Sequence, residues 1–178
     1  MSRLHQSRGA GRLISLAAAI LAVLAALGTL FAHHRSITAL ASKNQAILLQ
    51  SRATDTYNAY EAKQIRFNIY RALISTDLVR DAKVRKALED AAGTETESAS
   101  SVLQQAKLLE REAANEDERS QSVMKSYEML QYAAAAFQIA IVLVSISALV
   151  AARYFLPMVG VLATLGLTLL ALGLAQGG

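Results

Sequence analysis

The sequence predicts an all-α membrane protein with three transmembrane helices and a long extramembrane helical hairpin, coiled-coil-like, between the first and the second. The chain of 178 residues is 53% hydrophobic, which is more apolar than an ordinary soluble domain. Three uncharged segments supply this excess. The region between the first two contains no proline and one glycine, and its apolar residues recur at helical intervals.

The three uncharged segments are residues 13–32, 130–152 and 156–175. At about 1.5 Å per residue, each helix can cross the roughly 30 Å hydrocarbon core of a bilayer. The first segment has a second interpretation, a cleaved signal peptide. Its apolar run exceeds the roughly 7–15 residues that such peptides use, and His33, His34 and Arg35 follow it in place of a small-residue cleavage site. We therefore expect a retained anchor.

The charges predict the orientation of the spans. All acidic residues lie between Asp55 and Glu128, where basic residues balance them, so the net charge of +4 comes from four arginines outside this region. Those are Arg3, Arg8, Arg12 and Arg153. The positive-inside rule makes residues 1–12 a basic cytoplasmic N-terminus and residues 153–155 a tight cytoplasmic turn. Residues 33–129 would then face the periplasm or the cell exterior, and in a bacterial inner membrane the periplasm.

The stretch "AAGTETE", Ala91 to Glu97, predicts the tip of the hairpin. Gly93 can adopt the left-handed conformation that ends a helix, Thr94 can cap the next helix, and Glu97 completes a capping box. A second break is expected near "ISTDLVRD", where Ser75 or Thr76 would cap a shorter helix over residues 77–91.

The returning helix shows the most regular pattern. Steps of four and three residues predict a coiled-coil seam that continues into the second span without a hinge. Glu116 and Ser120 interrupt the seam, and a polar residue at such a position can fix register or oligomer number. The seam consists of Val102, Ala106, Leu109, Ala113, Glu116, Ser120, Val123, Tyr127, Leu130, Ala134, Phe137, Ile141, Val144 and Ala148.

The outgoing helix carries two apolar stripes, more than one partner helix can cover. The second stripe consists of Ala62, Ile65, Ile69 and Leu73. A homo-oligomeric bundle would supply the missing neighbours. The predicted transmembrane segments also favour association, because small residues such as Ala22 and Ala26 recur in them at spacings that allow helix backbones to approach closely.

The aromatic stretch of the outgoing helix is the candidate site. Its face is formed by Asp55, Tyr57, Tyr60, Lys63, Gln64, Phe67 and Arg71. One interpretation is a pocket for an anionic ligand, with Lys63 and Arg66 as donors. The other is helix packing, in which the tyrosines fill the bundle and the polar groups bond across it. Packing explains both stripes without a ligand, and we favour it.

The residues that catalysis or metal binding would need do not form a recognisable set. The chain has no cysteine, and the adjacent His33 and His34 point about 100° apart on a helix, so they cannot form a metal pair. The acidic run at residues 110–119 is typical of a solvated helix face. The neutral middle region argues against nucleic-acid binding. The spans contain no charged residue, which argues against proton-coupled transport. We expect no enzyme activity, no cofactor and no metal.

Residues 42–73 resemble the bacterial membrane proteins grouped as domain of unknown function 4337. The resemblance rests on an Ala-x-Asp-x-aromatic-x-x-Tyr-x-Ala-Lys pattern, met here by Ala53, Asp55, Tyr57, Tyr60, Ala62 and Lys63. It implies one N-terminal span, a coiled hairpin and two C-terminal spans, in the bacterial cytoplasmic (inner) membrane. It implies no activity. Many members of that family carry tryptophan at the position of Tyr57.

The expected function is that of a non-enzymatic integral membrane protein that self-associates through its hairpin, as a scaffold or as an accessory subunit of a membrane complex. Its partners would be the lipid bilayer, further copies of the chain and a larger membrane complex, and not nucleic acid. Two alternatives remain open at this point. One is a sensor-like periplasmic ligand-binding module, and the other is a small oligomeric channel.

Overall fold

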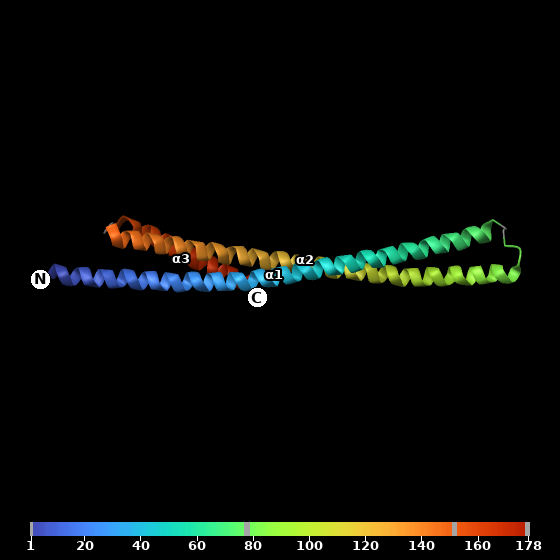
Figure 1. The fold of residues 1–178 in the computed structure, drawn as a ribbon, viewed down its shortest axis with the longest axis horizontal. Coiled ribbons are helices and arrows are strands. Elements are labelled where there is room, and N and C mark those ends of the chain that lie inside the picture. Colours follow the sequence, from blue (N-terminus) through green and yellow to red (C-terminus); the bar gives the residue numbers. More distant parts are fainter. Residues whose placement is uncertain (1, 77–78, 151–152, 177–178) are drawn as a thin grey trace. The chain divides into compact units, whose positions relative to one another are not determined.

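The computed structural model describes residues 2–76, 79–150 and 153–176, and all regular structure within them is helical. Helix α1 spans Ser2–Ser75 and helix α2 spans Ala82–Val150. A short 3-10 turn, η1 (Arg153–Phe155), leads into helix α3 (Leu156–Ala175). Figure 1 shows the three helices in chain order. The predicted all-α class is confirmed for these residues.

All three helices contain a stretch that is long and apolar enough to cross a membrane. The candidate spans lie in Ile14–Ser75, Ala82–Leu149 and Leu156–Ala175. Pro157 stands at the start of α3, where a missing backbone N–H costs no helical hydrogen bond.

The predicted reversal at residues 91–97 is wrong, because α2 runs through this stretch without a break. Gly93 lies inside the helix, and the Thr94 hydroxyl donates to the Asp90 carbonyl at 3.0 Å instead of capping a new helix. A glycine inside a helix costs only about 1 kcal/mol. Continuing the helix keeps Ala92 and Ala99 buried on one face, and this burial offsets the cost.

Helix α1 instead ends at Ser75 and α2 begins at Ala82, near the second break that the sequence predicted. The Ser75 and Thr76 hydroxyls donate to the Ala72 carbonyl at 3.0 and 2.9 Å, so they end α1 and do not cap the next helix. The expected start of that helix at Asp77 lies outside the described residues. Asp81 caps α2, since its carboxylate accepts a hydrogen bond from the Lys83 N–H at 2.8 Å.

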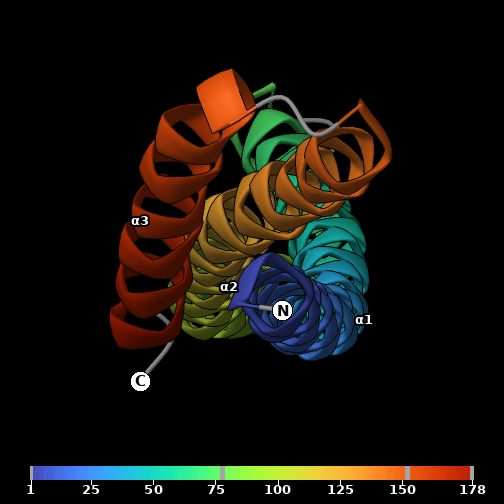
Figure 2. The same cartoon turned by 90° about the vertical axis from the view of Figure 1, so that its left-hand side faces the viewer.

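The chain divides into two compact units, and α1 and α2 contribute to both. The first unit contains Met1–Ala41 and Arg119–Gly178, and the second contains Ser42–Glu118. In the first unit, α1, α2 and α3 pack around one apolar cluster. Figure 2 views these helices end-on. The buried members are Leu21, Ala25, Ala133, Phe137, Ala140, Val144 and Val159.

Helix α3 packs on α2 through glycines that leave room for large side chains. A Cβ atom on Gly166 would meet the ring of Phe137, and one on Gly173 would meet Leu130. The buried Ser126 hydroxyl donates to the Gly173 carbonyl, which joins the C-terminal end of α3 to α2. Glycines let helices approach closely, and this approach replaces a hydrophobic driving force where the surroundings are lipid.

In the second unit, the segments of α1 and α2 run in opposite directions along one another. Three side-chain pairs establish this, because the partner's residue number falls as the residue number in α1 rises. The pairs are Lys43 with Asp117, Tyr57 with Glu110, and Lys63 with Glu95. Between the helices lie small side chains, and Ala53 and Ala106 are both fully buried.

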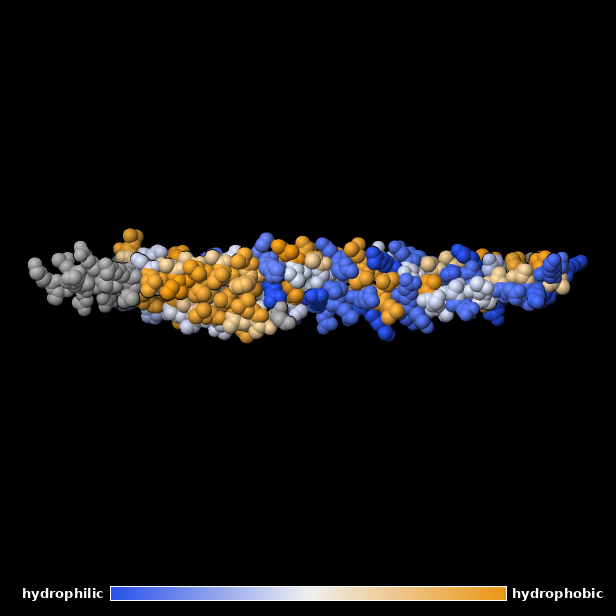
Figure 3. Space-filling view, turned by 90° about the horizontal axis from the view of Figure 1, so that it is seen from below, coloured by the Kyte–Doolittle hydropathy of each residue, from blue (hydrophilic) through white to orange (hydrophobic). Residues whose placement is uncertain are grey.

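The two units differ in the surface that they expose. In the view of Figure 3, hydrophobic side chains cover the described part of the first unit, while hydrophilic side chains predominate on the second unit with hydrophobic ones between them. A fully apolar outer surface is expected of helices that face lipid. The exposed apolar side chains of the second unit need another explanation.

Candidate functional site

The two cations of the predicted site are paired with one carboxylate. The Lys63 ammonium lies 3.4 Å from Glu95 Oε2 and donates to the Ser98 hydroxyl at 2.9 Å. Arg66 Nη1 lies 3.3 Å from Glu95 Oε1. The Glu95 side chain is only 16% exposed, so its charge is shielded from solvent and fully engaged by the two basic groups. This cluster links α1 to α2 within the second unit.

Tyr57 reaches a different carboxylate. Its hydroxyl donates a hydrogen bond to Glu110 Oε2 at 2.9 Å. This bond, with some desolvation and the nearby negative charge, raises the pKa of Tyr57 above the ordinary value of 10.0. Ionisation would break the bond and place two negative charges together. The neutral phenol is therefore the form that the structure favours.

The other residues of the predicted face do not converge on one point. Asp55 and Arg71 are exposed, while Tyr60, Gln64 and Phe67 are half-buried along α1. The structure thus brings Lys63 and Arg66 together on Glu95, and it brings Tyr57 to Glu110, a residue of the acidic run.

The seam predicted on α2 follows its inward face along most of its length. Val123 and Leu130 are buried, and Leu109, Glu116 and Tyr127 are half-buried. Ala148, at its end, is exposed. Ser120, one of the two polar interruptions, is buried and donates to the Ala39 carbonyl at 2.9 Å. A hydroxyl at this place therefore bonds to α1 without disturbing the packing.

Sequence reasoning missed a line of alanines on α1. These residues recur every seventh position and are all buried, and α2 carries a matching line. The seven-residue spacing of these alanines is visible in the sequence. Alanine is nevertheless a weak marker of a buried face, because it is common in every part of this chain. The line on α1 is Ala25, Ala32, Ala39, Ala46 and Ala53, and the line on α2 is Ala92, Ala99, Ala106 and Ala113.

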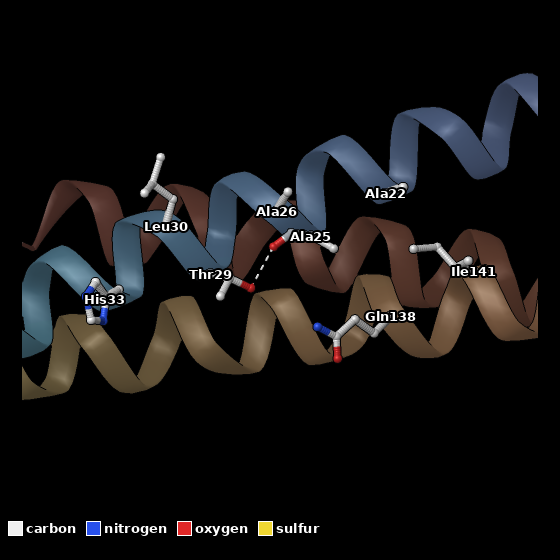
Figure 4. Close-up of a pocket in the computed structure, with 8 residues that line it drawn as sticks. All are labelled: Ala22, Ala25, Ala26, Thr29, Leu30, His33, Gln138 and Ile141. Atoms are coloured by element: carbon white, nitrogen blue, oxygen red, sulfur yellow. Dashed lines mark hydrogen bonds between the residues drawn. The ribbon is translucent and has the colours of Figure 1, made fainter.

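A groove in the first unit was also missed, with mostly apolar walls that carry a few polar side chains. Its walls are α1 and α2, and Figure 4 shows Thr29 on α1 and Gln138 on α2 on opposite walls. The groove has a volume of about 590 Å³. A second hollow of about 410 Å³ shares Thr29, His33 and Gln138 with it and adds Tyr127 and Gln131. We call the two hollows together the groove between α1 and α2. The seven-residue spacing of the two glutamines within an apolar segment is the signal that could have found this groove.

In the described part of the chain, no three histidine, aspartate or glutamate side chains lie close enough together to hold a metal ion. His33 lines the groove with uncharged neighbours.

Comparison with known proteins links the chain to one family. The family model described as Domain of unknown function (DUF4337) matches residues 10–176. Searches of curated proteins and of solved structures found no match to the chain. The matched residues include all three apolar stretches and the whole of the second unit. The chain therefore belongs to the DUF4337 family.

Proposed function

We propose that this chain is a non-enzymatic integral membrane protein that associates with further copies of itself and serves as a scaffold or as an accessory subunit of a membrane complex. The apolar stretches of α1, α2 and α3 are its spans. The second unit is a helical hairpin outside the bilayer, and its paired helices form an antiparallel coiled coil. The length and apolarity of the three stretches support the spans.

The orientation follows from the arginines. Arg3, Arg8 and Arg12 precede the first span, and Arg153 stands between the second and third. These residues favour a cytoplasmic N-terminus, with the hairpin in the periplasm of a bacterial cell.

One observation carries the proposal of self-association. The second unit exposes large apolar side chains although it lies outside the predicted spans, and they include Ile65 at 59% and Ile69 at 52% exposure. Ile47, Leu48 and Leu108 are similarly exposed. Each such side chain that is fully buried contributes about 1.5–3 kcal/mol relative to remaining exposed. A second copy of the hairpin supplies the neighbours that one copy lacks.

The contacts of Lys63 and Arg66 weigh against an anion pocket in the same unit. Both groups already interact with Glu95, so a bound anion would have to displace that carboxylate. The cluster is better explained as a link between the two helices of the hairpin.

The native particle tests the proposal. Extraction in mild detergent at natural expression level should give a particle whose mass is a multiple of the 19.1 kDa chain. A second protein present in fixed ratio would identify the chain as an accessory subunit. Replacing both Ile65 and Ile69 by serine should lower the copy number, while the control Ala59→Ser, on an exposed position of the same helix, should not. A monomer as the native species would contradict self-association.

The orientation has its own test. Gly93 is exposed, and a Cβ atom there would meet no neighbour within 4 Å, so Gly93→Cys should leave the fold intact. The chain has no other cysteine. We expect this thiol to react with a membrane-impermeant reagent in intact spheroplasts. Protection until the membrane is broken would place the hairpin in the cytoplasm.

A further inference from the structure

The groove between α1 and α2 of the first unit lies on a face that α3 leaves uncovered. Its lining residues come from α1 and α2 alone. Small side chains form part of its walls, and Ala22, Ala26 and Ala135 are exposed there. Phe137 and Leu130, by contrast, point to the side of α2 on which α3 packs. This face of the spans is therefore open to a further helix.

Two glutamine amides on this face pose a chemical problem. Gln131 and Gln138 lie within the apolar stretch of α2, and both are exposed. Among the residues that the structure describes, neither amide makes a hydrogen bond. Hydrocarbon offers no donor or acceptor, so an amide that faces lipid loses the bonds that it makes in water.

The hydroxyl groups of the same segments show how a polar side chain avoids this loss. Thr29 donates to the Ala25 carbonyl at 2.9 Å, and Ser145 donates to the Ile141 carbonyl at 2.9 Å. On α3, Thr168 donates to the Thr164 carbonyl at 2.8 Å. Each bond goes to the preceding turn of the same helix. The two glutamines make no such bond in the described chain, so both amides are available to bond to another molecule.

We propose that a second copy of this chain occupies the groove and that Gln131 and Gln138 bond to the same residues of that copy. An amide carries both a donor and an acceptor, so it is complementary to itself, whereas a charged partner would satisfy only one of these functions. The exposed alanines let the two copies approach closely enough for this contact. The inference rests on the proposed function, because it requires that these helices lie in a membrane.

The geometry of two copies in one membrane supports the pairing. Both copies have the same orientation, so their second spans are parallel. A two-fold axis along the membrane normal then places each residue near the axis opposite its own copy. Gln131 and Gln138 are seven residues apart, the spacing at which two parallel helices meet repeatedly on one face. Both amides can therefore pair in the same dimer.

Cysteine crosslinking in native membranes tests this arrangement, because the chain contains no cysteine of its own. Ala135 lines the groove between the two glutamines, so Ala135→Cys keeps both amides. We expect mild oxidation to give a disulfide-linked dimer of this variant. Leu165→Cys is the control, because Leu165 is 49% exposed on α3, close to Gly166, which packs on α2. It should give little dimer.

A second set of variants tests the amides. Replacing Gln131 and Gln138 by leucine in the Ala135→Cys background should reduce crosslinking about tenfold, since each lost interhelical hydrogen bond weakens association in lipid. Gln138→Asn retains an amide and should retain most of the dimer. The amount of each variant in the membrane, measured by immunoblot, shows that the chain still inserts.

The outcomes separate this inference from the proposed function. Strong crosslinking at Ala135→Cys that depends on the amides supports the dimer through this groove. A multimeric particle without this crosslink, or with equal crosslinking at Leu165→Cys, overturns the groove as the interface while self-association stands. A dimer that survives both leucine replacements overturns the role of the amides. A monomeric particle overturns both proposals.

Discussion

The ring of Phe137 occupies the space that a side chain on Gly166 would need. A Cβ atom at Gly166 would lie 2.6 Å from Cε1 of the ring and 2.9 Å from Cδ1 and Cζ. Real Cβ atoms do not approach other atoms so closely, so the ring or the helix must move. Gly166→Ala should therefore destabilise the packing of α3 by about 1–3 kcal/mol, the usual cost of overfilling a core. Thermal unfolding of the purified protein in detergent measures this change.

Gly160→Ala is the matched control on the same helix. A Cβ atom there meets nothing within 4 Å, and alanine favours a helix over glycine, so stability should stay unchanged or rise. Combining Gly166→Ala with Phe137→Leu should cost less than the sum of the two single changes, because the smaller side chain makes room for the methyl group. Additive costs would show that the two residues do not compete for this space.

The alanine lines of the second unit predict a steric effect. Ala53 is fully buried, so Ala53→Leu should force the helices of this unit apart and lower the free energy of unfolding by about 1–3 kcal/mol. Ala59 is exposed on the same helix, and Ala59→Leu should have little effect. Chemical unfolding followed by circular dichroism compares the two. Equal effects would mean that Ala53 does not lie at a tight contact.

The start of α2 can be tested at Asp81. Removing its carboxylate in Asp81→Ala leaves the Lys83 N–H without its acceptor and should cost about 0.5–2 kcal/mol, seen as faster amide exchange in the first turn. Asp81→Asn should preserve most of the cap. Thr94→Ala should have no comparable effect, since Thr94 lies within the helix. If Thr94→Ala frays the chain and Asp81→Ala does not, the turn lies at Gly93 after all.

The raised pKa of Tyr57 predicts that the stability of the fold depends on pH in the alkaline range. Its pKa is higher in the folded protein than the ordinary value of 10.0, so the folded state holds the proton more tightly than the unfolded state. The resulting stabilisation is fully present below pH 10.0 and is lost as pH rises through the folded pKa. Ultraviolet titration of tyrosinate, compared between the wild type and Tyr57→Phe, isolates this group. Glu110→Gln should return the Tyr57 pKa toward its ordinary value.

The amino-acid sequence predicted the helical class and the three apolar stretches well, because both depend on local pattern. Residues 13–32 and 156–175 are apolar throughout, and no tertiary contact is needed to recognise them. The turn was misplaced for the opposite reason. Gly93 and Thr94 form a locally plausible stop, but the burial of Ala92 and Ala99 against α1 favours a continuous helix. A capping pattern involves only residues that are neighbours along the chain, so it gives no information about that burial.

For a similar reason, the sequence could not predict which carboxylate the basic side chains of the polar face contact. Lys63 and Arg66 were recognised as donors, yet Glu95 lies far from them along the chain, and the misplaced turn put it at the tip. The glutamines of the groove were visible, but only the structure shows that α3 packs elsewhere and leaves them uncovered.

The repeated alanines have a consequence for alignment. Sliding one helix of the second unit past the other by seven residues would again place alanine on alanine, so the buried lines do not select their own alignment. The side chains at the edges of the contact between the two helices therefore determine the alignment. A slip in one direction would bring Lys63 opposite Val102, and a slip in the other would bring it opposite Leu88. Tyr57 would still meet Asp117 in the first case, and Lys43 would still meet Glu110 in the second. Partly exposed ion pairs contribute only about 0–1 kcal/mol each. The pair of Lys63 and Glu95 nevertheless distinguishes the native alignment from both shifted ones.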